Sequence, residues 1–230
     1  MSKLIKSILI VVLVLVVDQI LKIWIKTNMT LGEEFPVIGH WFMIHFVENN
    51  GMAFGFEFGG DYGKIFLSLF RVVAVFGIGW YILKLVKKDI PMGFIACVAL
   101  IFAGAVGNII DSAFYGLIFD ESYGKVSTLF PSGGGYASFL HGRVVDMFYF
   151  PLVSGVYPSW VPFAGGSDFQ FFRPVFNVAD SAISVGIFSI ILFYRRQFNK
   201  LDLHENAPVS DEFTADEVQP TVTENDSHLN

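Results

Sequence analysis

Four long apolar stretches constrain this chain more than any other feature of its sequence. They cover residues 4–25, 65–86, 92–110 and 178–194. The last would form about 26 Å of α-helix, close to the thickness of a bilayer core. At 53% hydrophobic residues, the chain is too apolar for an ordinary soluble domain. We therefore predict an all-α integral membrane protein with four transmembrane helices.

Basic residues mark one side of the predicted membrane domain. They stand before the first stretch, after the second and after the fourth: Lys3, Lys6, Lys84, Lys87, Lys88, Arg195, Arg196 and Lys200. Because cytoplasmic segments carry an excess of Lys and Arg, all three groups are expected inside the cell. Residues 1–200 then form one multi-pass membrane domain with both termini cytoplasmic. Its outer loops are residues 27–63 and 112–174.

The C-terminal segment, residues 201–230, differs sharply from this domain. It contains eight acidic residues and no Lys or Arg, and it accounts for the net charge of −6. Such polar, acidic composition is typical of disorder. We predict a disordered cytoplasmic tail, and no nucleic-acid partner for the chain.

The two outer loops differ in their local patterns. In the first, Phe35–Ile38 and Trp41–Val47 are predicted to be short strands of a small extracytoplasmic, β-rich cradle. Its Phe and Trp side chains suit a membrane interface. The second loop, rich in Gly, Ser and Tyr, is predicted to be a long connection.

Four separate carboxylates are predicted to meet at the outer membrane boundary. By the topology above, they lie in the first span, at the end of the third, in the second outer loop and at the start of the fourth: Asp18, Asp111, Asp146 and Asp180. An ionisable residue in a membrane is a functional-site candidate. For Asp180 there is also a structural interpretation, since Asn177 and Asp180 have the spacing of a helix-capping box.

Two close carboxylates can share one proton, activate water and protonate a leaving amine, as in aspartic proteases. Metal chemistry has little support in this sequence. It contains no H-E-x-x-H motif, and His40 and His45 have no evident third ligand. The single Cys97 lies in an apolar stretch. We predict no metal and no cofactor.

Five short motifs give the chain a resemblance to a known family. In order, they are Val17-Asp18-Gln19, Asn49-Asn50-Gly51-Met52-Ala53-Phe54, Gly107-Asn108-Ile109-Ile110-Asp111, Gly142-Arg143-Val144-Val145-Asp146 and Phe176-Asn177-Val178-Ala179-Asp180. With four spans, this order resembles that of bacterial lipoprotein signal peptidases (signal peptidase II). These are membrane aspartic endopeptidases that cleave diacylglyceryl-modified prolipoproteins on the amino side of the lipidated Cys.

The resemblance implies a set of site residues. Asp146 and Asp180 would be the catalytic dyad at the outer membrane face. Supporting or substrate-binding roles would fall to Asp18, Asn49, Gly51, Asn108, Asp111, Asn177 and Ala179. Prolipoproteins and membrane lipids would be the partners, and the protein would lie in a bacterial inner membrane. Aromatic residues of the first loop would cover the cut site: Trp41, Phe42, Phe46 and Phe54.

The chain departs from the family pattern in two places. Members usually carry Arg directly after the Asp111 position, where this chain has Ser112. We hypothesise that Arg143 supplies the missing cation by pairing with Asp111. Residues 113–141 also form a longer connection than in compact members, and the sequence indicates no role for them.

Two other classes of protein remain as alternatives. A proton-coupled transporter would also place carboxylates in the membrane, although we find no internal repeat and the carboxylates collect at one face. A structural scaffold would need no acidic pair. Peptidase activity on a lipid-modified signal peptide separates all three classes.

Overall fold

The computed structural model describes residues 1–50, 60–171, 174–195 and 197. Met1–Tyr194 form one compact unit. The expectations for Gly51, Phe54 and the acidic tail lie outside the described residues.

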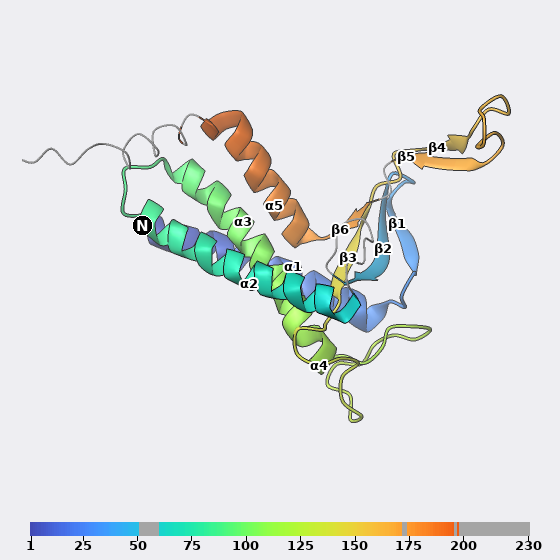
Figure 1. Cartoon of the computed structure of the whole chain (residues 1–230), viewed down its shortest axis with the longest axis horizontal. Coiled ribbons are helices and arrows are strands. Elements are labelled where there is room, and N and C mark those ends of the chain that lie inside the picture. The colour runs from blue at the N-terminus through green and yellow to red at the C-terminus, as the bar shows by residue number, and fades with distance from the viewer. Residues whose placement is uncertain (51–59, 172–173, 196, 198–230) are drawn as a thin grey trace, which may run out of the picture. The chain divides into compact units, whose positions relative to one another are not determined.

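Each predicted apolar stretch forms a helix (Figure 1). The long helices are α1 (Lys3–Asn28), α2 (Gly60–Leu85), α3 (Met92–Ile110) and α5 (Val178–Ser189). A π-helical turn, η2 (Asp111–Tyr115), and the short α4 (Gly116–Ile118) extend α3, and a second π-helical turn, η3 (Ile190–Tyr194), extends α5. Among the described residues, Lys3–Asn28 and Met92–Ile118 are long and apolar enough to cross a membrane.

Small residues allow α3 to approach its neighbours closely. A Cβ atom on Gly104 would lie 2.2 Å from the backbone oxygen of Ala179 in α5. On Gly107 it would lie 2.8 Å from the Asp18 carboxylate in α1. Only glycine fits at these positions, as is common where membrane helices pack. This close packing brings the Asp18, Asn108 and Asp180 regions together.

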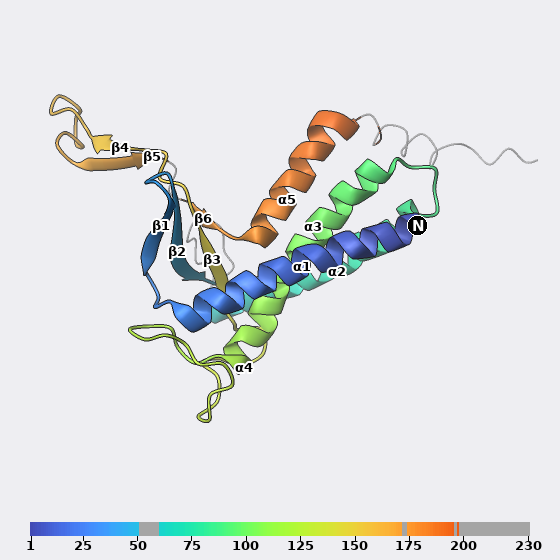
Figure 2. The same cartoon turned by 180° about the vertical axis from the view of Figure 1, so that it is seen from behind.

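The strands form two separate antiparallel sheets (Figure 2). The larger, in the order β1-β2-β3-β6, contains β1 (Glu34–Ile38), β2 (Phe42–Asn49), β3 (Val144–Tyr149) and β6 (Val175–Phe176). The smaller contains β4 (Val153–Val156) and β5 (Asp168–Phe171). The strands expected in the first loop are confirmed, and β3 pairs with β2 so that Asp146 lies opposite Val47.

A small core lies between the sheet and the ends of α1 and α3. Its buried side chains are Ile25, Met29, Phe46, Tyr115, Phe119, Val145 and Met147. Burying a large apolar side chain contributes about 1.5–3 kcal/mol. The Phe46 side chain is fully buried in this core, so the expectation that it covers the cut site is wrong. The described part of residues 112–174, expected to be one long connection, includes η2, α4 and β3. It supplies Tyr115, Phe119, Val145 and Met147 to this core.

Candidate active site

The start of α5 carries the capping box expected from the sequence. The Asn177 side chain accepts a hydrogen bond from the Asp180 backbone N–H at 2.8 Å, and Asp180 Oδ2 accepts one from the Asn177 N–H at 3.3 Å. These bonds satisfy two N–H groups that a helix start leaves without partners. They leave Asp180 Oδ1 to accept a bond from Asn108 Nδ2 at 2.9 Å. Asp180 thus has a structural role and a second contact outside its helix.

Asp146, on β3, is the second carboxylate at this place. Its Oδ1 accepts a hydrogen bond from Asn177 Nδ2 at 2.7 Å, and Asn49 Nδ2 donates to Oδ2. The residue is only 4% exposed. Burial, together with the nearby Asp180 charge, raises the pKa of the Asp146 carboxyl to about 8. Both effects favour the protonated form of Asp146.

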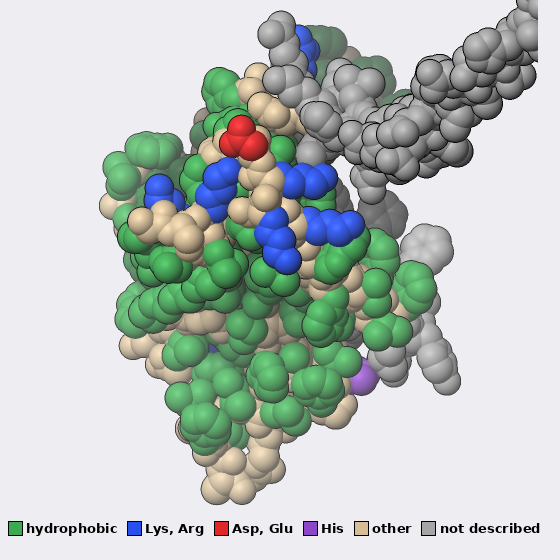
Figure 3. Space-filling model, turned by 90° about the vertical axis from the view of Figure 1, so that its left-hand side faces the viewer, with side chains coloured by type: hydrophobic (Ala, Val, Ile, Leu, Met, Phe, Trp, Pro, Cys, Tyr) green, Lys and Arg blue, Asp and Glu red, His purple; other side chains and the backbone are tan. Residues whose placement is uncertain are grey.

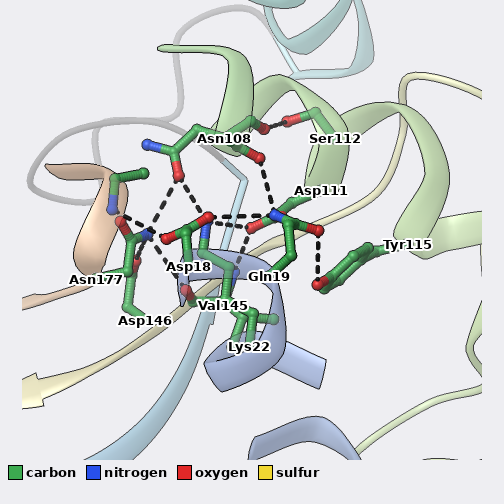
Figure 4. Close-up of polar contacts among 12 residues, drawn as sticks. Asp18, Gln19, Lys22, Asn108, Asp111, Ser112, Tyr115, Val145, Asp146 and Asn177 are labelled. Atoms are coloured by element: carbon green, nitrogen blue, oxygen red, sulfur yellow. Dashed lines mark hydrogen bonds and ion pairs between the residues drawn. The ribbon is translucent and has the colours of Figure 1, made fainter. Parts of the chain in front are cut away.

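Two asparagines connect the carboxylates of Asp146 and Asp180. Asn177 Nδ2, which contacts Asp146, also donates to Asn108 Oδ1 at 3.2 Å (Figure 4). Asn108 Nδ2 in turn donates to Asp180. Because these residues come from α3, β3 and the start of α5, the fold brings together three of the sequence motifs. Arg71 of α2 adds a cation that interacts electrostatically with both carboxylates.

A buried lysine organises the adjoining ion-pair cluster. Lys22 Nζ lies 2.9 Å from Asp18 Oδ2 and 2.8 Å from Asp111 Oδ2, and all three side chains are wholly buried. Lys22 also donates to Asn108 Oδ1 at 2.9 Å. Sequence reasoning missed Lys22. Its position four residues after Asp18, on the same face of α1, was the available signal.

The other contacts of Asp18 and Asp111 explain why they are fixed in place. Asp18 Oδ1 accepts the Ala179 backbone N–H at 2.9 Å, which ties α1 to the first turn of α5. Asp111 Oδ1 accepts from Gln19 Nε2 at 2.9 Å, and the Tyr115 hydroxyl donates to Gln19 Oε1 at 3.2 Å. Asp18 and Asp111 are thus partners of Lys22 rather than free carboxylates.

Arg143 does not pair with Asp111, so this part of the sequence-based hypothesis is wrong. Its guanidinium donates to Glu121 at 2.8 Å and to Glu48 at 3.2 Å. Lys22 already neutralises Asp111, while Arg143, just before β3, reaches the loop that follows α4. Ser112 is buried and donates to the Asn108 backbone oxygen at 3.1 Å.

The remaining predicted site residues can be placed relative to this centre. Asp18, Asn49, Asn108, Asp146, Asn177, Ala179 and Asp180 belong to one hydrogen-bonded assembly with Lys22. Asp111 joins it through Lys22, and Arg143 belongs to a different group of charges. Gly51 is outside the described residues.

These features define a class of protein: a membrane enzyme whose buried carboxylates meet beside its long apolar helices. Comparison with known proteins identifies the family. A family model described as "Signal peptidase (SPase) II" matches residues 10–196. The chain belongs to the signal peptidase II family.

Relatives with strong sequence similarity support this assignment. A protein of Porphyromonas gingivalis named "Lipoprotein signal peptidase" is 53% identical over 216 residues, covering 93% of this chain and 92% of the relative. A protein of Amoebophilus asiaticus with the same name is 36% identical, covering 88% and 83% of the two chains.

Solved structures give a consistent result. One described as a bacterial membrane enzyme at 2.3 Å resolution aligns with a TM-score of 0.52 and 25% identity, covering 93% of this chain and 94% of that one. Another, at 1.9 Å, has a TM-score of 0.51 and 28% identity, covering 81% and 90%. The fold is that of a membrane enzyme.

Proposed function

We propose that this signal peptidase uses Asp146 and Asp180 as an aspartic catalytic dyad. Its substrates would be diacylglyceryl-modified prolipoproteins, cut on the amino side of the lipidated Cys. Family membership supports the cleavage of signal peptides from prolipoproteins. The observation that carries the aspartic mechanism is the hydrogen-bonded connection between the two carboxylates through Asn177 and Asn108.

The two carboxyl groups would have different roles in peptide hydrolysis. Asp146, whose pKa of about 8 keeps it protonated, donates a hydrogen bond to the scissile carbonyl oxygen. Asp180 takes a proton from water as the water oxygen attacks the carbonyl carbon. As the tetrahedral intermediate forms, Asp146 gives its proton to the former carbonyl oxygen. When the C–N bond breaks, the proton on Asp180 passes to the leaving amine, and the proton on that oxygen returns to Asp146 as the C=O bond re-forms. The dyad then returns to its starting protonation state.

The surroundings of Asp180 suit the role of general base. It occupies the first turn of α5, where the helix dipole favours negative charge by about 0.3–1 kcal/mol. The Asn108 amide and the electrostatic interaction with Arg71 add to this stabilisation. A negative Asp180 in turn favours the proton on Asp146.

We further propose four spans, a β-rich cradle and an outer-face site. In Figure 3, Lys and Arg side chains gather on the face that includes the start of α1. There, Lys3 Nζ donates to the backbone oxygens of Lys88 and Ile90 at 3.0 and 2.9 Å. The positive-inside rule makes this face cytoplasmic. The dyad, near the far ends of α1 and α3, would then lie at the outer boundary, where a lipid-modified substrate arrives.

The decisive experiment is turnover of a diacylglyceryl-modified prolipoprotein by the purified, detergent-solubilised protein. We expect cleavage before the lipidated Cys, and slow cleavage of the same peptide without its lipid. Asp146→Asn and Asp180→Asn should each bind substrate without cutting it. A protein that moves protons across liposomes but leaves the lipidated substrate intact would instead support the transporter alternative.

A further inference from the structure

Among the described residues, β4 and β5 pair with each other and form no ladder with the four-stranded sheet. The hairpin that they form aligns Val153 with Phe171 and Val156 with Asp168. Within the described part of the chain, its extensive contacts are between its own two strands. A lone two-stranded hairpin is at best marginally stable in water. Its stability therefore calls for an external surface.

The tip of the hairpin is ordered by its own backbone hydrogen bonds. Tyr157 and Ser167 are joined by an N–H···O bond of 2.9 Å, and Gly166 donates back to the Tyr157 oxygen at 2.9 Å. Gly165 donates to the Val161 oxygen, also at 2.9 Å. The residues of the tip are thus held in a defined arrangement.

This ordered tip exposes an unusual concentration of apolar side chains. The exposed residues are Leu152, Val156, Tyr157, Trp160 and Phe163. Trp160 is 79% exposed, and Phe163 is fully exposed. The sequence from Pro151 to Ser167 contains no charged residue. A water-facing loop has no physical reason to display these side chains.

We propose that the β4–β5 hairpin inserts its aromatic tip into the outer leaflet of the bilayer. This inference rests on the proposed outer position of the active site. Trp and Tyr concentrate at membrane–water interfaces, where an apolar ring and a polar group are both accommodated. Protein interfaces are also enriched in Trp, Tyr and Phe, but they usually add Arg and a polar rim. Residues 151–167, which form β4 and the tip, carry no charge and so fit lipid better than a protein partner.

The hairpin is also continuous with an aromatic surface on the four-stranded sheet. Phe150, which follows β3 directly, stacks on Phe42 and on Phe176, and Trp41 lies against both Phe42 and Phe150. Aromatic residues thus extend from the sheet to the start of the hairpin. A single membrane surface could contact both.

The position of the hairpin in the chain connects it to the dyad. It joins β3, which carries Asp146, to β6, which leads into Asn177 and Asp180. β3 and β6 pair directly with each other, with Phe148 opposite Phe176. Anchoring the hairpin in the leaflet would therefore hold both halves of the dyad at one depth in the membrane. A lipid-anchored substrate presents its cut site at such a fixed depth.

The first test measures the position of the hairpin without using catalysis. In a Cys97→Ala background, Ser159→Cys places an environment-sensitive fluorophore at the exposed tip, and Ser132→Cys is the matched control in the other part of the outer loop. In proteoliposomes of phosphatidylethanolamine and phosphatidylglycerol, we expect a lipid-borne nitroxide to quench the Ser159→Cys label. Aqueous iodide should quench the Ser132→Cys label more strongly.

Two outcomes would overturn the insertion. One is a Ser159→Cys label that iodide quenches fully and the nitroxide lipid does not. The other is lipid shielding that disappears on dilution of the protein in the bilayer, which would indicate a second copy of the chain as the occupant. Because neither readout needs turnover, failure here is distinct from failure of the proposed peptidase function.

The second test measures the consequence for catalysis. Trp160→Ser combined with Phe163→Ser should raise KM severalfold in liposomes while leaving kcat in detergent unchanged. Trp160→Tyr with Phe163→Trp should restore the liposome value, since interfacial aromatic character is kept. Unchanged KM in liposomes would refute the link between the hairpin and substrate presentation.

Discussion

Two lysines one turn apart on α1, Lys22 and Lys26, contact different parts of the molecule. Lys22 and Lys26 are both wholly buried, and each is paired with carboxylates. Lys22 contacts Asp18 and Asp111, which are also wholly buried. Lys26 contacts Glu48, whose charge cluster reaches solvent through Arg143, 33% exposed, and Glu121, 45% exposed. We call these the inner and the outer network.

The difference lies in what each network connects. The inner network reaches the Ala179 N–H and Asn108, and through Asn108 it reaches Asp180 of the proposed dyad. The outer network joins α1 and β2 to the loop after α4: Lys26 donates to Ser122 at 3.0 Å and lies over the Tyr136 ring. The role of each buried lysine thus depends on the groups around it. Residues 113–141 have a structural role in the outer network, because they supply Glu121, Ser122 and Tyr136.

The largest expected effect is at the dyad beside the inner network. Asp146→Asn or Asp180→Asn should reduce turnover by more than about 10³-fold, because an amide cannot exchange the required proton. The double variant should be little worse than either single one. The matched control is Glu121→Gln, the same chemical change in the outer network, which should retain turnover. Substantial activity in either single variant would remove that residue from the dyad.

Lys22→Met should come next in size. The substitution leaves two wholly buried carboxylates, Asp18 and Asp111, without their cation. We expect the free energy of unfolding to fall by about 3–5 kcal/mol. Lys26→Met should cost less, since Arg143 remains beside Glu48. Denaturant unfolding in detergent measures both. Equal losses in the free energy of unfolding for the two variants would contradict the distinction between the networks. Adding Asp111→Asn to Lys22→Met should recover part of the lost stability, because it removes one of the unpaired carboxylates.

A pH profile would sharpen the assignment of roles within the site. Since the pKa of Asp146 is about 8, kcat/KM should fall about tenfold per pH unit above that value, as the required proton is lost. The free energy of unfolding should also fall as pH rises. The folded carboxyl holds its proton more tightly than the unfolded one, so this contribution is complete below about pH 4 and lost as pH rises towards 8. Glu121→Gln should leave the rate profile unchanged.

Arg143→Ala should have the smallest effect. Arg143 and Glu121 are both partly exposed, so water screens their interaction. We expect the free energy of unfolding to fall by about 1 kcal/mol. Turnover should remain close to wild type, as measured with the lipidated prolipoprotein. If turnover collapses while the protein stays folded, the outer network also supports catalysis.

The sequence predicted the parts of this structure that depend on local pattern and membrane topology. Apolar stretches located the helices, and the spacing of Asn177 and Asp180 predicted the capping box that the structure contains.

Contacts between distant segments were harder to predict. Lys22 was only an interruption in an apolar stretch, because spacing does not reveal which carboxylates a cation will meet across helices. Arg143 was assigned to Asp111, since Glu48 and Glu121 gave no local sign of their position. The strands in residues 112–174 are short, and β3 pairs with a segment about a hundred residues earlier.

The π-helical turn at Asp111–Tyr115 constrains the length of the chain as well as its residue types. An α-helix advances about 100° per residue, and a π-helical turn accommodates a residue more. Deleting one residue there would return the turn to an ordinary α-helix and keep the register of the residues beyond it. Inserting one residue would instead rotate those residues by about 100° relative to Asn108. Tyr115 would then lose its contact with Gln19, and Phe119 its place in the core beneath the sheet. The turn should therefore tolerate the loss of one position better than the gain of one.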